Sequence, residues 1–229
     1  MIYVTGDTHG TYDLEKLRVF AAEHKELTKK DYVIIAGDFG AVWSPQSLRT
    51  NLALYEALPF TTLFVDGNHE NFDMLDEYPV REWMGGKVHF ITEDIIHLTR
   101  GQVFLLEGKR IFTFGGATSV DRMWRKPFIS WWPNEIPSDK EIQEAEKNLN
   151  KVHRTVDYII THSCGEEALS LPPLSTRDFQ TDVYYENRVL SAFEKTVTYK
   201  HWYFGHYHMD ARLNDKTTAL YQWVLPLQE

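Results

Sequence analysis

The sequence predicts an α/β fold in which short β-strands alternate with amphipathic helices. Before residue 71, three runs rich in β-branched and aromatic residues, 2–5, 32–36 and 61–65, are separated by two stretches with helical periodicity. Each run leads directly into a short motif of glycine and polar residues. Ligand sites of α/β sheets lie at the carboxyl ends of the strands, so the sequence places a candidate site there.

Two helices are expected between these three strands. Asp13 is a candidate cap for the first, and its apolar residues recur at helical spacing over 14–21. Ser44 followed by Pro45 is a typical start for the second, with the cap followed by proline at the first helical position. Pro59 is expected to end it.

The middle of the chain changes character. Runs 88–91 and 95–98 predict short strands, and runs 102–106 and 110–114 flank the turn sequence 107–109, which indicates a hairpin. A mixed sheet or a second sheet is therefore expected.

Residues 115–137 are expected to form an irregular, Trp-rich insertion. It contains Trp124, Trp131 and Trp132. Exposed aromatic rings beside a phosphate site could stack on the base or sugar of a nucleotide. The alternative, slightly favoured, is that they cover the core or form a subunit interface.

The last third returns to alternating elements. A capping box of Ser138 and Glu141 predicts a helix start, and a second helix is expected around Tyr185. Strands are expected over 157–161, 201–204 and 218–225. Since no linker, repeat or low-complexity tract separates these elements, we expect a single domain over 1–229.

Composition limits the classes of function. The net charge of −9 disfavours loose binding to anionic membranes or long nucleic acids. Neither a signal peptide nor an apolar run of membrane-spanning length is present in the sequence. Cys164 is the single cysteine, so an intrachain disulfide is impossible. These features predict a soluble, cytoplasmic protein.

Residues able to bind a metal follow five of the expected strands. Asp7 and His9 are two apart, so in extended backbone their side chains point to the same side. The complete set is Asp7, His9, Asp38, Asn68, His69, His162, His206 and His208. Oxygen and imidazole ligands without thiolate suit manganese, iron or zinc. This many residues predicts two ions, with Asp38 as the bridging carboxylate.

The charge of such a site suits a phosphate substrate. Only Asp7 and Asp38 are anionic in the set, so two divalent cations would leave the site positive. Paired ions roughly 3.5–4 Å apart can generate hydroxide at neutral pH and stabilise both the attacking and the leaving oxygen.

Five motifs together resemble those of the calcineurin-like metallophosphoesterase superfamily. They are Gly6-Asp7-Thr8-His9-Gly10, Gly37-Asp38, Gly67-Asn68-His69-Glu70, His162 and Gly205-His206-Tyr207-His208. The resemblance covers residues 6 to 208 and implies a four-layer α/β/β/α sandwich with two mixed sheets and a dinuclear metal centre in the cleft above them.

The resemblance also implies a role for each residue. The first ion would be held by Asp7, His9, Asp38 and His208. The second would be held by Asp38, Asn68, His162 and His206. His69 would face the substrate, protonating the leaving oxygen or stabilising charge on the phosphoryl group.

One motif departs from that of the protein serine/threonine phosphatases in this superfamily. Their second motif reads Gly-Asp-x-x-Asp-Arg-Gly, whereas residues 37–43 lack the second Asp and the Arg. A strict protein-phosphatase assignment is therefore disfavoured. Arg122 and Arg125 in the irregular segment are the candidates to bind the phosphate instead.

The expected function is hydrolysis of phosphate esters by a metal-bridging hydroxide that attacks phosphorus in line, with His69 assisting the leaving group. A phosphomonoesterase with manganese is favoured, acting on a phosphorylated small molecule, a nucleotide or a phosphoprotein. The alternatives are a phosphodiesterase acting on nucleotides or nucleic acid, and a non-catalytic metal-binding interaction module. A nucleophilic role for Cys164 is disfavoured because the neighbouring His162 is assigned to metal.

Overall fold

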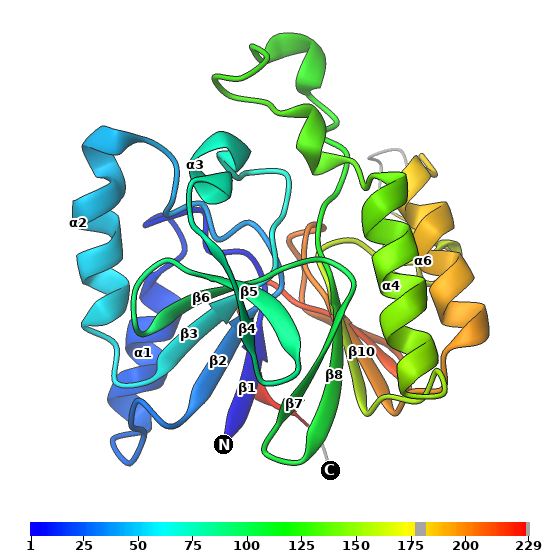
Figure 1. The fold of residues 1–229 in the computed structure, drawn as a ribbon, viewed down its shortest axis with the longest axis horizontal. Helices are drawn as coiled ribbons and strands as arrows, with labels where there is room; N and C mark the ends of the chain where they lie inside the picture. The colour runs from blue at the N-terminus through cyan, green and yellow to red at the C-terminus, as the bar shows by residue number, and fades with distance from the viewer. Residues whose placement is uncertain (177–181, 228–229) are drawn as a thin grey trace.

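The computed structural model describes residues 1–176 and 182–227 and shows two β-sheets packed face to face (Figure 1). In the described residues the first sheet has seven strands, in the order β13 (Val224–Pro226), β1 (Ile2–Thr5), β2 (Tyr32–Ile35), β3 (Thr61–Phe64), β6 (Ile95–Leu98), β5 (Gly86–Phe90) and β4 (Val80–Trp83). Strands β1, β2, β3 and β6 are parallel, whereas β13 and β5 run antiparallel to them.

The second sheet has six strands in the same described ranges. Their order is β11 (Ala211–Asn214), β12 (Thr217–Ala219), β10 (His201–Phe204), β9 (Tyr158–Thr161), β8 (Lys109–Phe114) and β7 (Gln102–Leu106). Strands β8, β9, β10 and β12 are parallel, and the edge strands β7 and β11 are antiparallel. Both sheets are therefore mixed.

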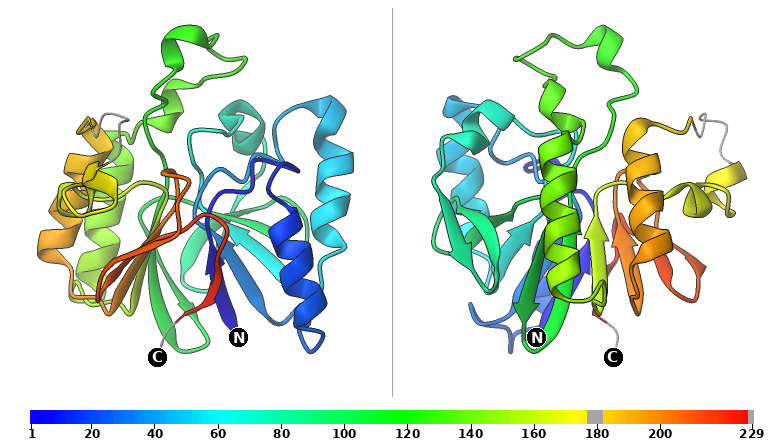
Figure 2. Two further views of the ribbon diagram at one scale, coloured as in Figure 1. Left: turned by 180° about the vertical axis from the view of Figure 1, so that it is seen from behind. Right: turned by 45° about the vertical axis from the view of Figure 1, so that its right-hand side comes forward.

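Helices cover the outer face of each sheet. Helices α1 (Glu15–Glu23) and α2 (Pro45–Glu56) lie on the first sheet, and α4 (Asp139–Lys151) and α6 (Tyr185–Thr196) lie on the second (Figures 1 and 2). This arrangement confirms the four-layer α/β/β/α sandwich. None of the helices in the described residues combines the length and the apolarity that a bilayer-spanning helix requires.

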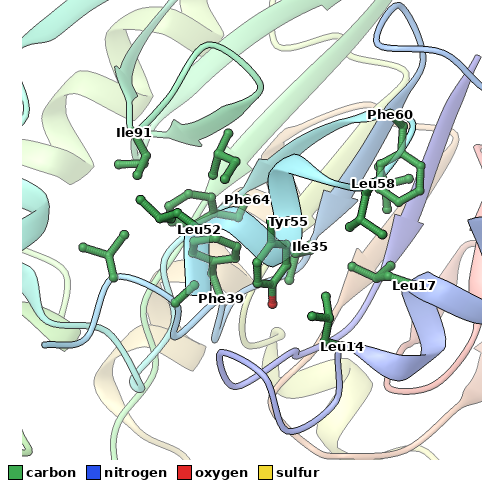
Figure 3. Packing of buried hydrophobic residues seen from close by; sticks show 14 of the residues in the cluster. Leu14, Leu17, Ile35, Phe39, Leu52, Tyr55, Leu58, Phe60, Phe64 and Ile91 are labelled. Carbon is green, nitrogen blue, oxygen red and sulfur yellow. The ribbon is translucent and has the colours of Figure 1, made fainter. Parts of the chain in front are cut away.

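The alternation of side chains along the strands builds the layers. In β2, Ile34 packs between the two sheets with Ile111 of the second sheet. Its neighbours Val33 and Ile35 point the other way, into the cluster beneath α1 and α2, where Figure 3 shows Ile35. Because successive strand residues face opposite sides, a strand covered on both faces is apolar throughout, as the sequence of β2 is.

Two predicted boundaries are wrong. Asp13 does not cap α1; the helix begins after Leu14, which makes no side-chain cap, because the Asp13 carboxylate is bound elsewhere, as described below. Residues 218–225 do not form one strand, since β12 belongs to the second sheet and β13 to the first. In the segment between these two strands, the backbone N–H groups of residues 221–223 donate hydrogen bonds to the carboxylate of Asp210. These bonds hold the turn that takes the chain from one sheet to the other.

Four short elements of the structure were not predicted from the sequence. These are α3 (Phe72–Asp76), β4, α5 (Glu166–Leu169) and β11. Strand β4 is mostly exposed, so it lacks the apolar alternation from which a strand can be recognised. The two helices are too short to show helical periodicity.

Residues 115–137 leave β8 and project above the sheets (Figures 1 and 2). Their only regular structure is two short 3₁₀ helices, Arg122–Trp124 and Pro133–Glu135. Trp132 is buried and packs edge-to-face against Trp43, with ring centroids 5.6 Å apart, whereas Trp124 is 84% exposed. Trp132 is therefore buried, Trp131 is half-buried and Trp124 is open to solvent, so the three tryptophans do not share one role.

Candidate metal centre

The predicted site residues converge at the carboxyl ends of parallel strands from both sheets. The first sheet supplies them after β1, β2 and β3, and the second supplies them after β9 and β10. The residues that follow these strands are Asp7 and His9, Asp38, Asn68 and His69, His162, and His206 and His208. Because the sheets pack against each other, five loops distant in sequence meet at one edge.

Four of these residues form a compact group that could hold a metal ion. One side-chain nitrogen or oxygen from each of Asp7, His9, Asp38 and His208 lies within 4.8 Å of the others. His9 Nε2 is 3.3 Å from Asp38 Oδ2. His208 Nε2 is 3.2 Å from Asp7 Oδ2. This is the set that the family resemblance implied for the first ion.

The set predicted for the second ion adjoins it through Asp38. His162 Nε2 lies 3.3 Å from Asp38 Oδ1 and 3.1 Å from Asn68 Oδ1. The ring of His206 lies beside that of His162, with centroids 5.0 Å apart. Asp38 is thus in contact with both groups, which is the position that a bridging carboxylate would need.

The atoms of this cluster fit a cation. Asp7 Oδ1 accepts the backbone N–H of His206, and the buried Oδ2 lies 3.2 Å from His208 Nε2. His162 Nδ1 donates to Ala36 O at 2.9 Å, and its Nε2 faces the oxygens of Asp38 and Asn68. Oxygen and nitrogen atoms that converge in a buried site require a positive charge between them, which a proton or a metal ion supplies.

The electrostatics of the cluster lead to the same conclusion. Burial alone would raise the pKa of Asp38, but His162 and His9 hold that pKa well below its usual value. Burial would lower the pKa of His162, yet the charges of Asp38 and Asp7 raise it to about 10. The pKa of His9 rises to about 9, chiefly because its contact with Asp38 outweighs burial. The carboxylates therefore remain ionised and attract cations.

The backbone of the cluster is strained. His9, Asp38, His206 and His208 all have positive φ angles, of 44°, 49°, 67° and 46°. This left-handed region is unfavourable for residues with a Cβ atom, and such residues gather at functional sites. The strain turns the chain sharply after each strand and directs these side chains into the cluster.

Motif glycines let the ligand side chains cross neighbouring backbone. A Cβ atom on Gly67 would lie 2.1 Å from Asp38 Oδ1, and one on Gly205 would lie 2.2 Å from Asp7 Oδ1. Either contact is far shorter than van der Waals distance. Gly67 in the third motif thus leaves room for the carboxylate of Asp38 in the second motif. In the same way, Gly205 in the fifth motif leaves room for the carboxylate of Asp7 in the first motif.

His69 lies at the edge of the cluster and contacts one of the two predicted arginines. Arg125 Nη2 is 2.9 Å from His69 Nε2, and Arg125 Nε pairs with Asp121 at 2.7 Å. Burial and then the Arg125 charge lower the pKa of His69. The side chain of Arg122 is exposed on its 3₁₀ helix instead. The structure therefore brings Arg125, rather than Arg122, to the candidate site.

Sequence reasoning missed the residues that hold the cluster in place. Glu70 is buried and accepts the backbone N–H groups of Phe39 and Gly40, which ties the third motif to the second. Ser119 Oγ donates to Glu135 and in turn accepts from Asn68 Nδ2, which directs Asn68 Oδ1 to His162. Glu70 lies inside a recognisable motif, whereas no local pattern marks Ser119.

Cys164 follows His162 but takes no part in this chemistry. Its side chain is 1% exposed, and burial raises the pKa of the thiol well above its ordinary value. A thiol that stays protonated is a poor nucleophile, in agreement with the sequence-based interpretation.

Known proteins resemble this chain in sequence and in fold. Lariat debranching enzyme A of Xenopus laevis is 30% identical over 105 residues, which cover 39% of this chain and 20% of that enzyme. A Staphylococcus aureus structure, provisionally assigned as a 5′-nucleotidase, superposes with a TM-score of 0.53 at 18% identity. The match covers 96% of this chain and 48% of that protein.

Phosphopantetheinyl hydrolase of Mycobacterium tuberculosis superposes with a TM-score of 0.46 at 15% identity, over 96% of this chain and 87% of that one. The chain thus spans one fifth of the length of the debranching enzyme and about half that of the Staphylococcus protein. The profile of the calcineurin-like phosphoesterases matches residues 1–210. The chain belongs to the calcineurin-like phosphoesterase family.

Proposed function

We propose that this protein is a metal-dependent phosphoester hydrolase that prefers phosphomonoesters. The observation that carries the proposal is the group of Asp7, His9, Asp38 and His208, whose ligand atoms lie within 4.8 Å of one another at the cleft edge. Membership of the phosphoesterase family supports the same chemistry. We further propose that the chain is one domain and acts in the cytoplasm.

The residues are assigned to two divalent cations. Asp7, His9, Asp38 and His208 would hold the first, and Asp38, Asn68, His162 and His206 the second. Oxygen and imidazole ligands suit manganese, iron or zinc, of which manganese is favoured. When bound, such ions supply an activated water nucleophile and neutralise phosphoryl oxygens. Two carboxylates would leave the loaded site positive and therefore attractive to a phosphate.

The preference for monoesters rests on Arg125. Its guanidinium lies beside His69 at the edge of the cluster, where it could bind a terminal phosphoryl oxygen. A monoester dianion carries one such oxygen more than a diester, so a further cation favours the monoester. His69 is assigned to the leaving oxygen, which it would protonate or stabilise by a hydrogen bond.

A phosphodiesterase acting on nucleotides or nucleic acid is the second candidate. The observation that favours it is Trp124, which precedes Arg125 and is 84% exposed. An exposed indole near the phosphate site could stack on a base.

The proposal is tested with 4-nitrophenyl phosphate and bis(4-nitrophenyl) phosphate in the presence of manganese. We expect the wild type to hydrolyse the monoester faster than the diester and to contain bound metal by elemental analysis. Asp38→Asn is expected to lose both the hydrolytic activity and the bound metal. Asp215→Asn, in an exposed turn, is the matched control. Metal-loaded protein that hydrolyses neither ester would disprove the enzymatic proposal, and faster hydrolysis of the diester would support the second candidate.

A further inference from the structure

A cavity of about 740 Å³ opens directly beside the cluster of candidate metal ligands described above, which is called the metal cluster below. Three of the predicted site histidines, His9, His69 and His208, form part of its wall. The cavity extends from them between the turn that follows β1 and the start of α2, where Ser47 and Asn51 line it. Its volume lies within the range of roughly 300–1,000 Å³ that is typical of small-molecule sites.

Away from the histidines the wall of this cavity, as far as the structure describes it, is largely aromatic and carries no cationic side chain. Tyr12, Trp43 and Tyr221 contribute rings, and Ser47 and Asn51 contribute uncharged polar groups. Among the described residues that line it there is no lysine or arginine. A further phosphate or an acidic peptide would therefore find no cationic partner in this part of the cavity.

The carboxylate in the wall, Asp13, adds a negative charge, which disfavours an anionic ligand further. Asp13 Oδ2 lies 2.8 Å from His9 Nδ1, and Asp13 Oδ1 accepts the Tyr221 hydroxyl at 2.9 Å. Both oxygens are thus engaged within the protein. A bound group would meet mainly rings, hydroxyls and an amide.

The walls are held in place before any ligand binds. The Tyr55 hydroxyl donates to Gly10 O at 2.6 Å, which fixes the turn that carries Tyr12. Asn51 Nδ2 donates to Ala41 O at 3.3 Å, which orients the Asn51 amide. Trp43 packs edge-to-face on the buried Trp132. A cavity that is already formed loses little entropy when a ligand enters it.

We propose that this cavity binds the alcohol part of the substrate, and that this alcohol is uncharged, bears a planar ring and is of nucleoside size. The inference rests on the proposed function, because it places the scissile phosphate at the cluster. His69, assigned there to the leaving oxygen, lines the same cavity. On hydrolysis the bond from phosphorus to this alcohol breaks, the oxygen of water joins phosphorus, and the alcohol leaves with a proton through the cavity.

The first experiment compares kcat/KM for adenosine monophosphate, phenyl phosphate and glycerol 2-phosphate. We expect both ring-bearing esters to be preferred over glycerol 2-phosphate, and Tyr12→Ala and Trp43→Ala to reduce that preference by about tenfold, the usual scale of ring stacking. Tyr12 is 90% exposed, so its variant is expected to fold. Preference for the adenosine ester over the phenyl ester would identify a nucleoside, and the reverse order a simple aryl alcohol.

The second experiment tests the charge of the cavity. The wild type is expected to prefer adenosine monophosphate to adenosine diphosphate, because the group that leaves from the terminal phosphate of the diphosphate is adenosine monophosphate, which would bring a negative phosphate into the cavity. Ser47→Lys places a cation in the wall and is expected to reduce that preference. Thr50→Lys adds the same charge at an exposed position of α2 that does not line the cavity and is the control.

A third measurement separates this inference from the proposed function. Adenosine and phenol are titrated calorimetrically into the metal-free protein, where no hydrolysis occurs. If adenosine or phenol binds to the wild type and binds more weakly to Trp43→Ala, the cavity assignment is supported even if no ester is hydrolysed. Active protein whose ester preferences are unchanged in Tyr12→Ala, Trp43→Ala and Ser47→Lys would overturn the inference and leave the proposed function standing.

Discussion

Asp13 and Tyr221 join the two ends of the chain beside the metal cluster. The Tyr221 hydroxyl donates to Asp13 Oδ1 at 2.9 Å, and Asp13 Oδ2 lies 2.8 Å from His9 Nδ1. The Tyr221 ring also stacks on that of His208, with centroids 4.8 Å apart and planes at 16°. One contact between a carboxylate and a phenol therefore holds the rings of two residues assigned to the first ion.

We predict that Tyr221→Phe weakens metal binding by about tenfold. The substitution removes the hydroxyl but keeps the ring on His208, and loss of a group that orients a ligand typically costs about 10–100-fold in affinity. Manganese affinity measured by calorimetry is the test. Tyr78→Phe, which alters a partly buried tyrosine outside the cluster, is the control. If Tyr221→Phe and Tyr78→Phe bind manganese with equal affinity, the Tyr221 hydroxyl does not position His9.

Gly205→Ala is predicted to abolish metal binding while the fold is retained. The new methyl group would lie 2.2 Å from Asp7 Oδ1, so either Asp7 or the loop after β10 has to move. Elemental analysis and circular dichroism together provide the measurement. Gly108→Ala is the comparison, because a Cβ atom at Gly108 meets nothing within 4 Å although its φ is +76°. We expect Gly108→Ala to cost about 1–2 kcal/mol in stability and to bind metal normally.

Removal of metal is predicted to lower the melting temperature. A ligand present at 100 times its Kd stabilises the folded state by about 2.7 kcal/mol, which corresponds to about 5–10 °C for a chain of this size. Thermal unfolding with manganese and with a chelator measures the difference. In Asp38→Asn the two curves are expected to coincide. A wild type whose melting temperature is the same with metal and with chelator would contradict binding at this cluster.

The part of the site that the sequence predicted is the part encoded locally. Asp7 and His9 share one strand end, and the topology of an α/β sheet brings strand ends together, so convergence with Asp38 follows from order alone. Asp13 shows the limit of this reasoning. It lies where a helix cap is expected, and only the distant Tyr221 explains why it serves His9 instead.

The fold was predictable to a similar extent. Buried strands such as β2 are recognised by their composition, whereas β4 depends on pairing with β5 and is exposed. The split of residues 218–225 between two sheets depends on Asp210, whose partners lie eleven to thirteen residues away. Neither feature has a signal in a local sequence window.

Glu194 of α6 provides a prediction on pH that is independent of the metal cluster. Burial and the neighbouring Glu167 raise the pKa of this carboxyl to about 7, although Lys195 lowers it in part. The folded state therefore binds more protons than the unfolded state between the unfolded value of 4.5 and about 7. Since stability falls with pH wherever the folded state binds more protons, the contribution of Glu194 to the free energy of unfolding declines across this window.

Glu194→Gln removes the titration, and the variant is predicted to be more stable than the wild type at pH 8 but not at pH 4. Because the side chain is partly exposed, we expect a difference of about 1 kcal/mol at pH 8, or about 2–4 °C in melting temperature. Urea unfolding of both proteins at the two pH values measures it. Glu56→Gln, at an exposed position of α2, is the matched control. A gain that is equal at pH 4 and pH 8 would arise from packing rather than from the charge, and would contradict this account.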